Sequence, residues 1–452
     1  MATEDLFIIA IELGSSKITG VGGKKLPDGS IQIEAVVQEP SSMFIRKGKI
    51  YNLDKSTQCI KSIIKRLEEQ LKRTITQVYV GYGGKSLHSE HNSILKRFDA
   101  ELPISKEIVD DLMKENLDTH SGDFDILEVI PQEFGVGSQK QIDPVGVLSN
   151  NIEGRYLNIM AHSSLRSNID ACFNNVGIHI VEDKLIPLVI ADEILSDTEK
   201  RSGCVLVDFG ADTTTVSVYK ANLLRFLSVI PLGSANITKD IMSCQLEESD
   251  AEELKLTHGC VATELTDEQG NATVYKLPDN TIITKAQLTE IIQARCEEIL
   301  QNVKYQIETS KFGRESLMAG AWLTGCGANL KNISKAFTEV VGFDKVRIVK
   351  SPRQVVHLAK NIKNNDGQLL SVICLLAKGT QICTSSQYQE KTPAANIFEP
   401  TEESPAQQVE PTPPVTQAEE KKEVKEKNPM KSLFKNAVAK LKNFSDKIVG
   451  EE

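Results

Sequence analysis

One local pattern occurs twice in this 452-residue chain, and it constrains the fold more than any other feature. IIAIELGSSKITGVG surrounds Glu12 and Gly14, and VLVDFGADTTTVSVY surrounds Asp208 and Gly210. Each copy has a strand-like apolar run, an acid, an apolar residue, a glycine, small polar residues and a second strand-like run. The glycine lets backbone N–H groups approach an anion, and the acid suits a hydrated magnesium ion. The pattern therefore predicts two hairpins that hold a polyphosphate from opposite sides.

A third glycine-rich segment follows the second copy. The run Leu323-Thr324-Gly325-Cys326-Gly327-Ala328-Asn329-Leu330 predicts a strand that enters a glycine turn and then a helix. Such a turn lets the backbone approach a sugar or base, or directs a helix N-terminus at a phosphate. Each of the three segments alone is also typical of an ordinary tight turn, so the prediction depends on their occurring together.

The rest of the chain favours a soluble α/β protein. Strand-like runs such as 6–13 and 31–37 alternate with helical patterns such as 53–73 and 288–310. Hydrophobic residues make up 40% and charged residues 25%, as in soluble globular proteins. The formal net charge is -10 and no basic stripe runs through the body of the chain, so we expect no nucleic-acid partner.

The sequence lacks the patterns that several other kinds of site or segment require. Gly84-Lys85-Ser86 resembles the end of a P-loop, but Tyr79 stands where that motif needs its first glycine. The seven histidines form no H-E-x-x-H spacing, and the nine cysteines form no C-x-x-C pair, so we expect reduced cysteines and no zinc site. The longest apolar run, 369–377, is far shorter than the about 20 residues that cross a bilayer. The acidic N-terminus does not resemble a secretory signal, which predicts a cytoplasmic protein.

The C-terminal part has a different composition. Residues 387–428 are rich in Pro, Glu, Gln and Thr and predict a disordered linker, because they contain too little apolar surface to offset the entropy of ordering. Asn428 and Pro429 are typical of a helix start, and 429–449 predicts a basic amphipathic helix. Its residues expected to contact a lipid surface are Met430, Leu433, Phe434, Lys435, Val438, Lys440, Leu441, Phe444, Lys447 and Ile448.

Three roles are compatible with this terminal helix: an anchor on a membrane surface, a helix that docks in a partner's groove, or a helix that packs on its own protein. The long linker disfavours the last role, and the lysines favour an anionic bilayer. We therefore predict an anchor.

In order and spacing, the three glycine segments resemble the first phosphate, second phosphate and adenosine motifs of the actin/Hsp70/sugar-kinase superfamily. The closer resemblance is to the FtsA family of bacterial cell-division proteins. It is carried by VIPQEFGV (129–136), DPVGVLSNNIEG (143–154), IPLGSANITKDI (230–241) and SDAEELKLTHGC (249–260), and it extends from about residue 6 to 385.

The resemblance implies a two-lobed actin-like (ribonuclease-H-like) ATPase fold with an inserted subdomain, a linker and a terminal helix. The implied segments are subdomain 1A (1–83, 165–198 and 371–386), the insert 1C (84–164), subdomain 2A (199–234 and 308–370), subdomain 2B (235–307), the linker (387–428) and the amphipathic helix (429–449).

The resemblance also implies a site for ATP and Mg²⁺ between the lobes. The implied phosphate-binding residues are Gly14, Ser15, Ser16, Lys17, Gly210, Ala211, Asp212, Thr213 and Thr214. The residues implied near the ribose and base are Gly233, Glu252, Lys255, Gly325, Gly327 and Asn329. Glu12 and Asp208 would hold the metal through water, and Asp208 and Asp212 are the candidates for a catalytic role, which is not assigned to either.

The family's function implies an ATP-binding adaptor, at most a slow ATPase, that tethers FtsZ to the cytoplasmic face of the inner membrane at the division septum. It implies as partners the FtsZ C-terminal peptide, with Arg295 as a contact or an ordinary surface ion pair, anionic lipid, further copies of the chain in a filament, and later division proteins. A small-molecule kinase of the same superfamily is the alternative. Four departures from the superfamily pattern make fast turnover unexpected: Glu12 in place of Asp, Gly-Ala-Asp at 210–212, Cys326, and Cys374.

Overall fold

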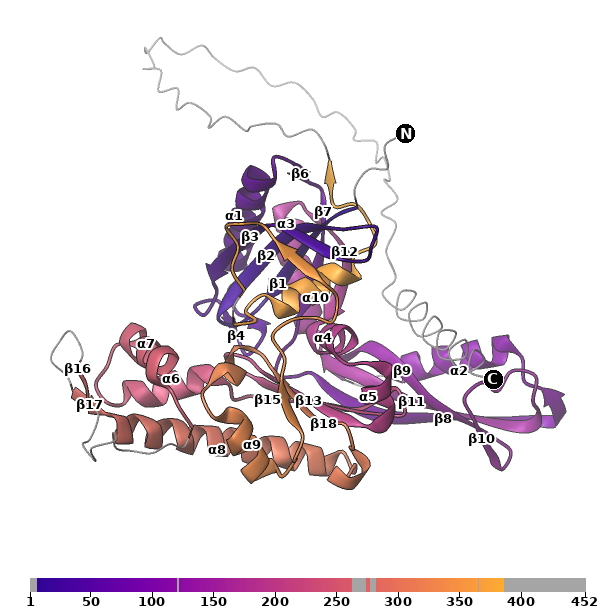
Figure 1. Ribbon diagram of the computed structural model, residues 1–452. Helices are drawn as coiled ribbons and strands as arrows, with labels where there is room; N and C mark the ends of the chain where they lie inside the picture. The colour runs from indigo at the N-terminus through magenta and orange to yellow at the C-terminus, as the bar shows by residue number, and fades with distance from the viewer. Residues whose placement is uncertain (1–5, 120–121, 262–273, 277–281, 365, 386–452) are drawn as a thin grey trace, which may run out of the picture.

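A computed structural model describes residues 6–119, 122–261, 274–276, 282–364 and 366–385. These residues form two α/β lobes and an inserted unit of sheet and helix (Figure 1). The predicted linker at 387–428 and the predicted terminal helix at 429–449, with its ten proposed lipid contacts, lie outside the described residues.

The first lobe is a sheet between two layers of helices. Its central strand β1 is buried along almost its whole length, which requires cover on both faces. Gly20 of β2 faces Ile63 of α1, whereas Gly81 of β7 faces Ile186 of α4 and Leu375 of α10 on the opposite side. The six strands, in sheet order, are β12 (His179–Leu185), β7 (Gln77–Tyr82), β1 (Phe7–Leu13), β2 (Lys17–Lys25), β3 (Ile31–Pro40) and β20 (Val356–Leu358). The helices are α1 (Leu53–Leu71), α3 (Ser164–Val176), α4 (Ile186–Ile194) and α10 (Leu370–Lys378).

The second lobe repeats the strand topology of the first. Strands β13, β14 and β15 form an antiparallel meander as β1, β2 and β3 do, and β18 and β19 extend β13 in parallel as β7 and β12 extend β1. The two copies of the sequence pattern therefore occupy equivalent places. The strands are β13 (Cys204–Phe209), β14 (Thr214–Lys220), β15 (Leu223–Ile230), β18 (Gly320–Thr324) and β19 (Val346–Ile348). The helices are α5 (Asp197–Ser202), α6 (Ser234–Met242), α7 (Glu248–His258), α8 (Lys285–Thr309), α9 (Ile333–Val341) and the 3-10 turns Arg314–Ser316 and Cys326–Asn329.

Three short strand pairs and one isolated β-bridge complete the lobes in the described residues. They are β4 (Ile45–Arg46) with β5 (Lys49–Ile50), β6 (Thr74–Ile75) with β21 (Thr384–Ser385), and β16 (Val274–Lys276) with β17 (Ile282–Thr284), together with an isolated bridge between Cys260 and Lys331.

The insert leaves the first lobe after β7 and returns to it at α3, but its sheet pairs with the second lobe. It consists of β8 (His88–Pro103), α2 (Lys106–Asp118), β9 (Phe124–Val136), β10 (Gln139–Gln141) and β11 (Leu148–His162). Its own core includes the fully buried Leu112, Phe134 and Tyr156. The resulting nine-stranded sheet has the order β10-β9-β11-β8-β15-β14-β13-β18-β19. In Figure 1 its labelled strands lie below the first lobe, from β10 in the insert to β18.

The contact between the insert and the second lobe includes a buried glutamine. Gln132 of β9 donates from Nε2 to the carbonyl oxygen of Leu224 (3.1 Å), and its Oε1 accepts from Nη1 of Arg225 (2.9 Å). Beside it the strand pairing is short, because β8 and β15 share only the register pair His88 and Ser228.

The substitution Gln132→Leu tests this contact. It removes both hydrogen bonds and leaves their buried partners unpaired. We therefore expect the free energy of unfolding to fall by about 1 to 3 kcal/mol. Urea unfolding followed by circular dichroism measures the change. Gln301→Leu, at an exposed glutamine of α8, is the matched control and should change stability by less than about 0.5 kcal/mol. Equal stability of the two variants would contradict the importance of this contact.

Candidate functional site

The first and second hairpin turns have the same local geometry. A Cβ atom on Gly14 would lie 2.6 Å from the carbonyl oxygen of Lys17, and one on Gly210 would lie 2.8 Å from that of Thr213. Each turn thus closes on the carbonyl oxygen three residues later, and both glycines are required by this close approach. The hydrogen bond from Gly210 N to Thr213 O is 2.9 Å long.

The two turns lie on either side of a short hairpin that the sequence analysis did not assign to the site. The amide of Gly48 donates to Oγ of Ser15 in the first turn (2.9 Å), and the amide of Lys47 donates to Oδ2 of Asp212 in the second turn (2.9 Å). Since Lys47 and Gly48 are adjacent, Ser15 and Asp212 are held close together although they come from different lobes. The turns therefore lie together where the resemblance implies the cleft between the lobes.

Two acids lie at the base of this cleft without a basic partner in hydrogen-bond contact. Burial raises the pKa of Glu12 from its usual 4.5 to about 7, although Oε2 accepts a hydrogen bond from Oγ of Ser371 (2.7 Å), and the charge of Asp208 raises this pKa further. Burial also raises the pKa of Asp208, to about 6. Both residues keep some exposed surface. Their negative charges are poorly compensated, which is the electrostatic condition that a bound cation relieves.

The predicted magnesium ion fits this donor set. Among the described residues, no group of three or more His, Cys, Asp and Glu side chains is placed to hold a metal ion. Two carboxylates suit Mg²⁺, which prefers oxygen ligands, usually keeps several waters and binds phosphate oxygens. Glu12 and Asp208 would hold such an ion through water.

The predicted adenosine turn packs directly on the second hairpin. Gly325 has a φ of +82°, and a Cβ atom there would lie 2.4 Å from Oδ1 of Asp208. A Cβ atom on Gly327 would lie 2.9 Å from Cβ of Phe209. Asn329 donates from Nδ2 to the carbonyl oxygen of Asp366 (2.8 Å), so its side chain fixes the neighbouring loop.

Gly233 completes the second turn. A Cβ atom on this residue would lie 2.4 Å from the carbonyl oxygen of Ala211, and the following residue, Ser234, donates its amide to Gly210 O (3.0 Å). Helix α6 therefore begins against the predicted phosphate loop, and its first amides, those of Ser234 and Ala235, donate to the carbonyl oxygens of Gly210 and Ala211.

Glu252 and Lys255 of α7 bind each other beside the start of α6. The buried Nζ of Lys255 donates to Oε2 of Glu252 (2.6 Å), to Oγ1 of Thr238 (2.8 Å) and to the carbonyl oxygen of Ser234 (3.2 Å). These contacts place both residues on the side of Gly327, because a Cβ atom there would lie 3.5 Å from Cβ of Ser234.

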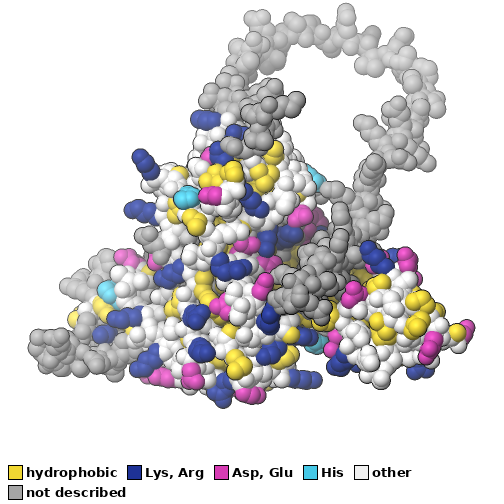
Figure 2. All heavy atoms as spheres, turned by 45° about the vertical axis from the view of Figure 1, so that its right-hand side comes forward, with side chains coloured by type: hydrophobic (Ala, Val, Ile, Leu, Met, Phe, Trp, Pro, Cys, Tyr) yellow, Lys and Arg dark blue, Asp and Glu magenta, His cyan; other side chains and the backbone are white. Residues whose placement is uncertain are grey.

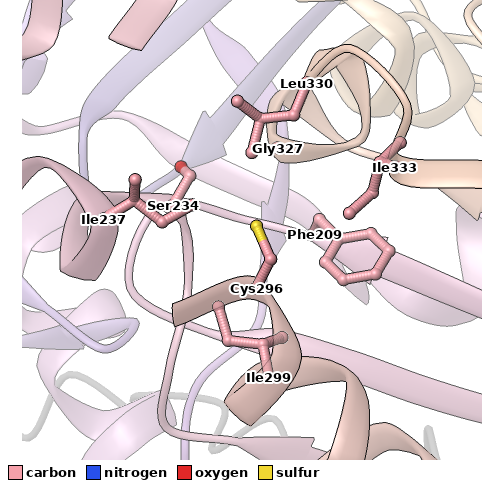
Figure 3. Close-up of a pocket in the computed structure, with 8 residues that line it drawn as sticks. All are labelled: Phe209, Ser234, Ile237, Cys296, Ile299, Gly327, Leu330 and Ile333. Carbon is pink, nitrogen blue, oxygen red and sulfur yellow. The ribbon is translucent and has the colours of Figure 1, made fainter. Parts of the chain in front are cut away.

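An apolar pocket adjoins the same side of the site. Figure 3 shows Cys296 of α8 with its sulfur toward Gly327, and Ile299, Ser234 and Phe209 around it. The remaining lining residues are Ile237, Leu330 and Ile333. The pocket borders the place where the resemblance puts the base.

Not every predicted residue has a free side chain in the cleft. The hydroxyl of the buried Thr214 donates to the carbonyl oxygen of Leu232 (2.9 Å), and Lys17 donates from Nζ to Oε1 of Gln368 (3.0 Å). Ser16 is exposed, and Ala211 and Thr213 are partly buried within the second turn.

Arg295 lies outside the cleft, on α8. It makes a two-bond ion pair with Asp240 of α6, with distances of 2.6 and 2.9 Å, and a third contact with Glu298. The sequence predicted for Arg295 either a contact with a partner peptide or an ordinary surface ion pair, and the structure contains the ion pair. A partner peptide would have to compete with both of these carboxylates.

Sequence reasoning missed Ser371, Gln368, Lys47 and Gly48. The first two lie beyond residue 360 and show no motif. The run Ile45-Arg46-Lys47-Gly48-Lys49-Ile50 has a glycine between two short strand-like pairs, which is a hairpin signal. That signal gives no indication of what the turn contacts.

Comparison with known proteins gives two family matches. The family described as "Cell division protein FtsA" matches residues 205–370, and "SHS2 domain inserted in FTSA" matches residues 84–160. Relatives named cell division protein FtsA include that of Porphyromonas gingivalis, 29% identical over 419 residues that cover 90% of this chain and 85% of the relative. That of Escherichia coli K12 is 27% identical over 365 residues, which cover 77% of this chain and 84% of the relative.

A solved structure supports the fold. A "PilM-PilN type IV pilus biogenesis complex" aligns with a TM-score of 0.57 and 16% sequence identity, over 82% of this chain and 96% of that one. Together with the match to the inserted domain, this confirms the predicted fold class, a two-lobed actin-like α/β fold with an inserted subdomain.

The raised pKa of Glu12 predicts a pH dependence of stability. Because the folded protein keeps this proton up to about pH 7 whereas the unfolded chain loses it near pH 4.5, the wild type loses stability as the pH rises through this interval. Glu12→Gln cannot ionise and still offers an acceptor to Ser371. We expect this variant to be more stable than the wild type at pH 8, by roughly 1 to 3 kcal/mol, and nearly equal to it at pH 4.

Urea unfolding at both pH values measures this difference. Glu297→Gln, at an exposed acid of α8, serves as the control and should follow the wild type at both values. If Glu12→Gln had the same free energy of unfolding as the wild type at pH 8, ionisation of Glu12 would not destabilise the fold. That result would refute the claim that its negative charge is poorly compensated.

Proposed function

Because the chain belongs to the FtsA family of cell division proteins, we propose that it is an ATP-binding, actin-like adaptor that tethers FtsZ to the cytoplasmic face of the inner membrane. It would assemble with further copies of itself and recruit later division proteins at the septum. The observation that carries the proposal is the meeting of the two glycine turns over Glu12 and Asp208.

ATP would lie across the cleft with its phosphates between the two turns. Backbone amides of the two glycine turns suit phosphate oxygens. A bound Mg²⁺ would neutralise part of the phosphate charge, and Glu12 and Asp208 would orient its waters. Gly233, Gly325 and Gly327 would let the backbone approach the ribose and base closely.

Binding rather than rapid turnover is the proposed use of the nucleotide. Asp212 accepts a hydrogen bond from the amide of Lys47, so this candidate acid already has a partner. Neither Asp212 nor Asp208 is assigned as a base for a substrate hydroxyl, and for this reason we prefer the adaptor to the kinase.

The proposed partner surfaces lie away from the cleft. The FtsZ C-terminal peptide would bind subdomain 2B at 235–307, where Arg295 is available only if Asp240 or Glu298 releases it. Figure 2 shows hydrophobic side chains gathered on the insert, and Leu95 and Leu148 there are 54% and 67% exposed. Such exposed apolar residues suit contacts with later division proteins or with a neighbouring copy.

Membrane attachment is proposed for the segment 429–449. Of the helices in the described part of the chain, none combines the length and apolar character needed to span a bilayer. A basic amphipathic helix would instead lie in the interface, with its lysines near anionic headgroups. A single helix binds reversibly, so assembly of several copies would strengthen attachment.

Gly233→Ala tests nucleotide binding. Its Cβ atom would lie 2.4 Å from Ala211 O, so the second turn must shift and its amides must leave their positions. We expect the Kd for Mg-ATP, measured by equilibrium dialysis, to rise at least tenfold, or about 1.4 kcal/mol. Gly83→Ala is the matched control because a Cβ atom there has no heavy atom within 4 Å. Unchanged binding in Gly233→Ala would remove this turn from the site.

Removal of the terminal helix tests attachment. The full chain should sediment with vesicles that contain an anionic lipid, and a chain that ends at Asn428 should remain in the supernatant. Vesicles of neutral lipid are the control and should retain less of the full chain, because each lysine near an anionic surface contributes about 1 kcal/mol. Equal sedimentation of the two chains would contradict the anchor.

A further inference from the structure

The β4–β5 hairpin, residues 45–50, lies where the two lobes and the insert meet. Its turn is formed by Lys47 and Gly48, both with positive φ, of 49° and 77°. A non-glycine residue in this conformation is strained, so the surrounding contacts must hold it in place.

On one side the turn touches both predicted phosphate loops. The amide of Gly48 binds Ser15, and the amide of Lys47 binds Asp212, each over 2.9 Å. The segment before the hairpin is fixed to the first loop as well. Ser41 donates from Oγ to the carbonyl oxygen of Gly14 (2.7 Å) and from its amide to that of Ser16 (3.0 Å), and its own carbonyl oxygen accepts from the amide of Ile45 (2.8 Å).

On the other side the turn touches the point where the chain enters the insert. The amide of Lys85 donates to the carbonyl oxygen of Lys47 (2.9 Å). The backbones are in direct contact, since a Cβ atom on Gly48 would lie 2.4 Å from Cα of Gly84 and 2.5 Å from the carbonyl oxygen of Gly83. Lys47 therefore bonds the second lobe through its amide and the insert through its carbonyl oxygen.

The contacts continue to the point where the chain leaves the insert. Ser86 accepts at Oγ from the amide of His162, the last residue of β11 (3.3 Å). At the far end of the hairpin, Asn168 of α3 donates from Nδ2 to the carbonyl oxygen of Ile50 (3.2 Å). The crossing into the insert thus contacts this hairpin through Lys85, and the crossing out of it is linked to the hairpin through Ser86, the residue after Lys85.

We propose that Lys47 and Gly48 are positioning residues of the nucleotide site, and that their turn couples occupation of the phosphate loops to the position of the insert. The inference rests on the proposed nucleotide binding. A ligand that draws Ser15 and Asp212 together must move or clamp the turn between them. The bonded series Asp212, Lys47, Lys85, Ser86 and His162 then carries that change to the base of the insert.

Hydrogen exchange in the nucleotide-free full chain tests the coupling itself. Mass spectrometry with fragmentation to single residues would follow the amides of Lys47 and Lys85. Asp212→Ala removes the acceptor, so exchange should become at least threefold faster at Lys47 and also faster at Lys85, whose amide does not touch Asp212. Asp212→Asn keeps an acceptor oxygen and should restore slow exchange at both. Asp344→Ala, at an exposed acid of the same lobe, is the control.

Faster exchange at Lys47 alone, with Lys85 unchanged, would overturn the coupling. If Asp212→Ala does not fold, Gly48→Ala decides instead. Its Cβ atom would push the turn from Gly84, so exchange at Lys85 should become at least threefold faster and the Kd for Mg-ATP should rise by a similar factor. No change in either quantity would overturn the proposal.

Mg-ATP separates this inference from the proposed function. In the wild type, saturating Mg-ATP should slow exchange at Lys47 and Lys85 together, while dialysis reports binding independently. Binding without any effect at Lys85 would refute the coupling and leave the nucleotide site standing. Absence of binding would refute the nucleotide function, and the nucleotide-free variants would still decide whether the turn links Asp212 to the insert.

Discussion

The site depends on the close packing of backbone around Asp208. Gly210, Gly233 and Gly325 come from three different segments, and each approaches its neighbour so closely that a Cβ atom would lie less than 3 Å from another heavy atom. This packing fixes the second turn before any ligand arrives. It also buries Asp208 without a counter-charge, which raises the pKa of this acid. A cation bound beside Asp208 would stabilise its ionised form.

The first lobe builds its half of the site by a different route. Glu12 receives a hydrogen bond from Ser371 of α10, and the glycine turn beside it is held by Ser41 and by the β4–β5 hairpin. The two lobes share their strand topology, but the supports of their turns are not equivalent. The β4–β5 hairpin that supports the first turn also contacts the insert, which enters and leaves the first lobe while its sheet pairs with the second. Relative motion of the lobes must therefore be accommodated at the insert.

The sequence predicted helices, strands and turns well where neighbouring residues in the chain determine them. The repeated hairpins were recognised because a buried strand and a turn that needs glycine leave a direct mark on the sequence. The long helix predicted at 288–310 begins earlier, at Lys285, because Thr284 and Gln287 cap each other. Side-chain availability was less predictable. Thr214 has the right residue type and position for phosphate, yet its hydroxyl binds the Leu232 carbonyl, a partner that becomes adjacent only when β14 and β15 pair.

The sequence by itself determined the two acid-and-glycine turns, the glycine-rich turn at 325–327, the α/β class and the composition of the last sixty-odd residues, because these depend on neighbours along the chain. Only the tertiary structure decided three pairings. Lys47 donates a hydrogen bond to Asp212, Ser371 donates one to Glu12, and Arg295 forms an ion pair with Asp240. Each of these pairs joins residues far apart in the chain. Their meeting is fixed by how whole sheets and helices pack, and no local pattern of residues records that packing.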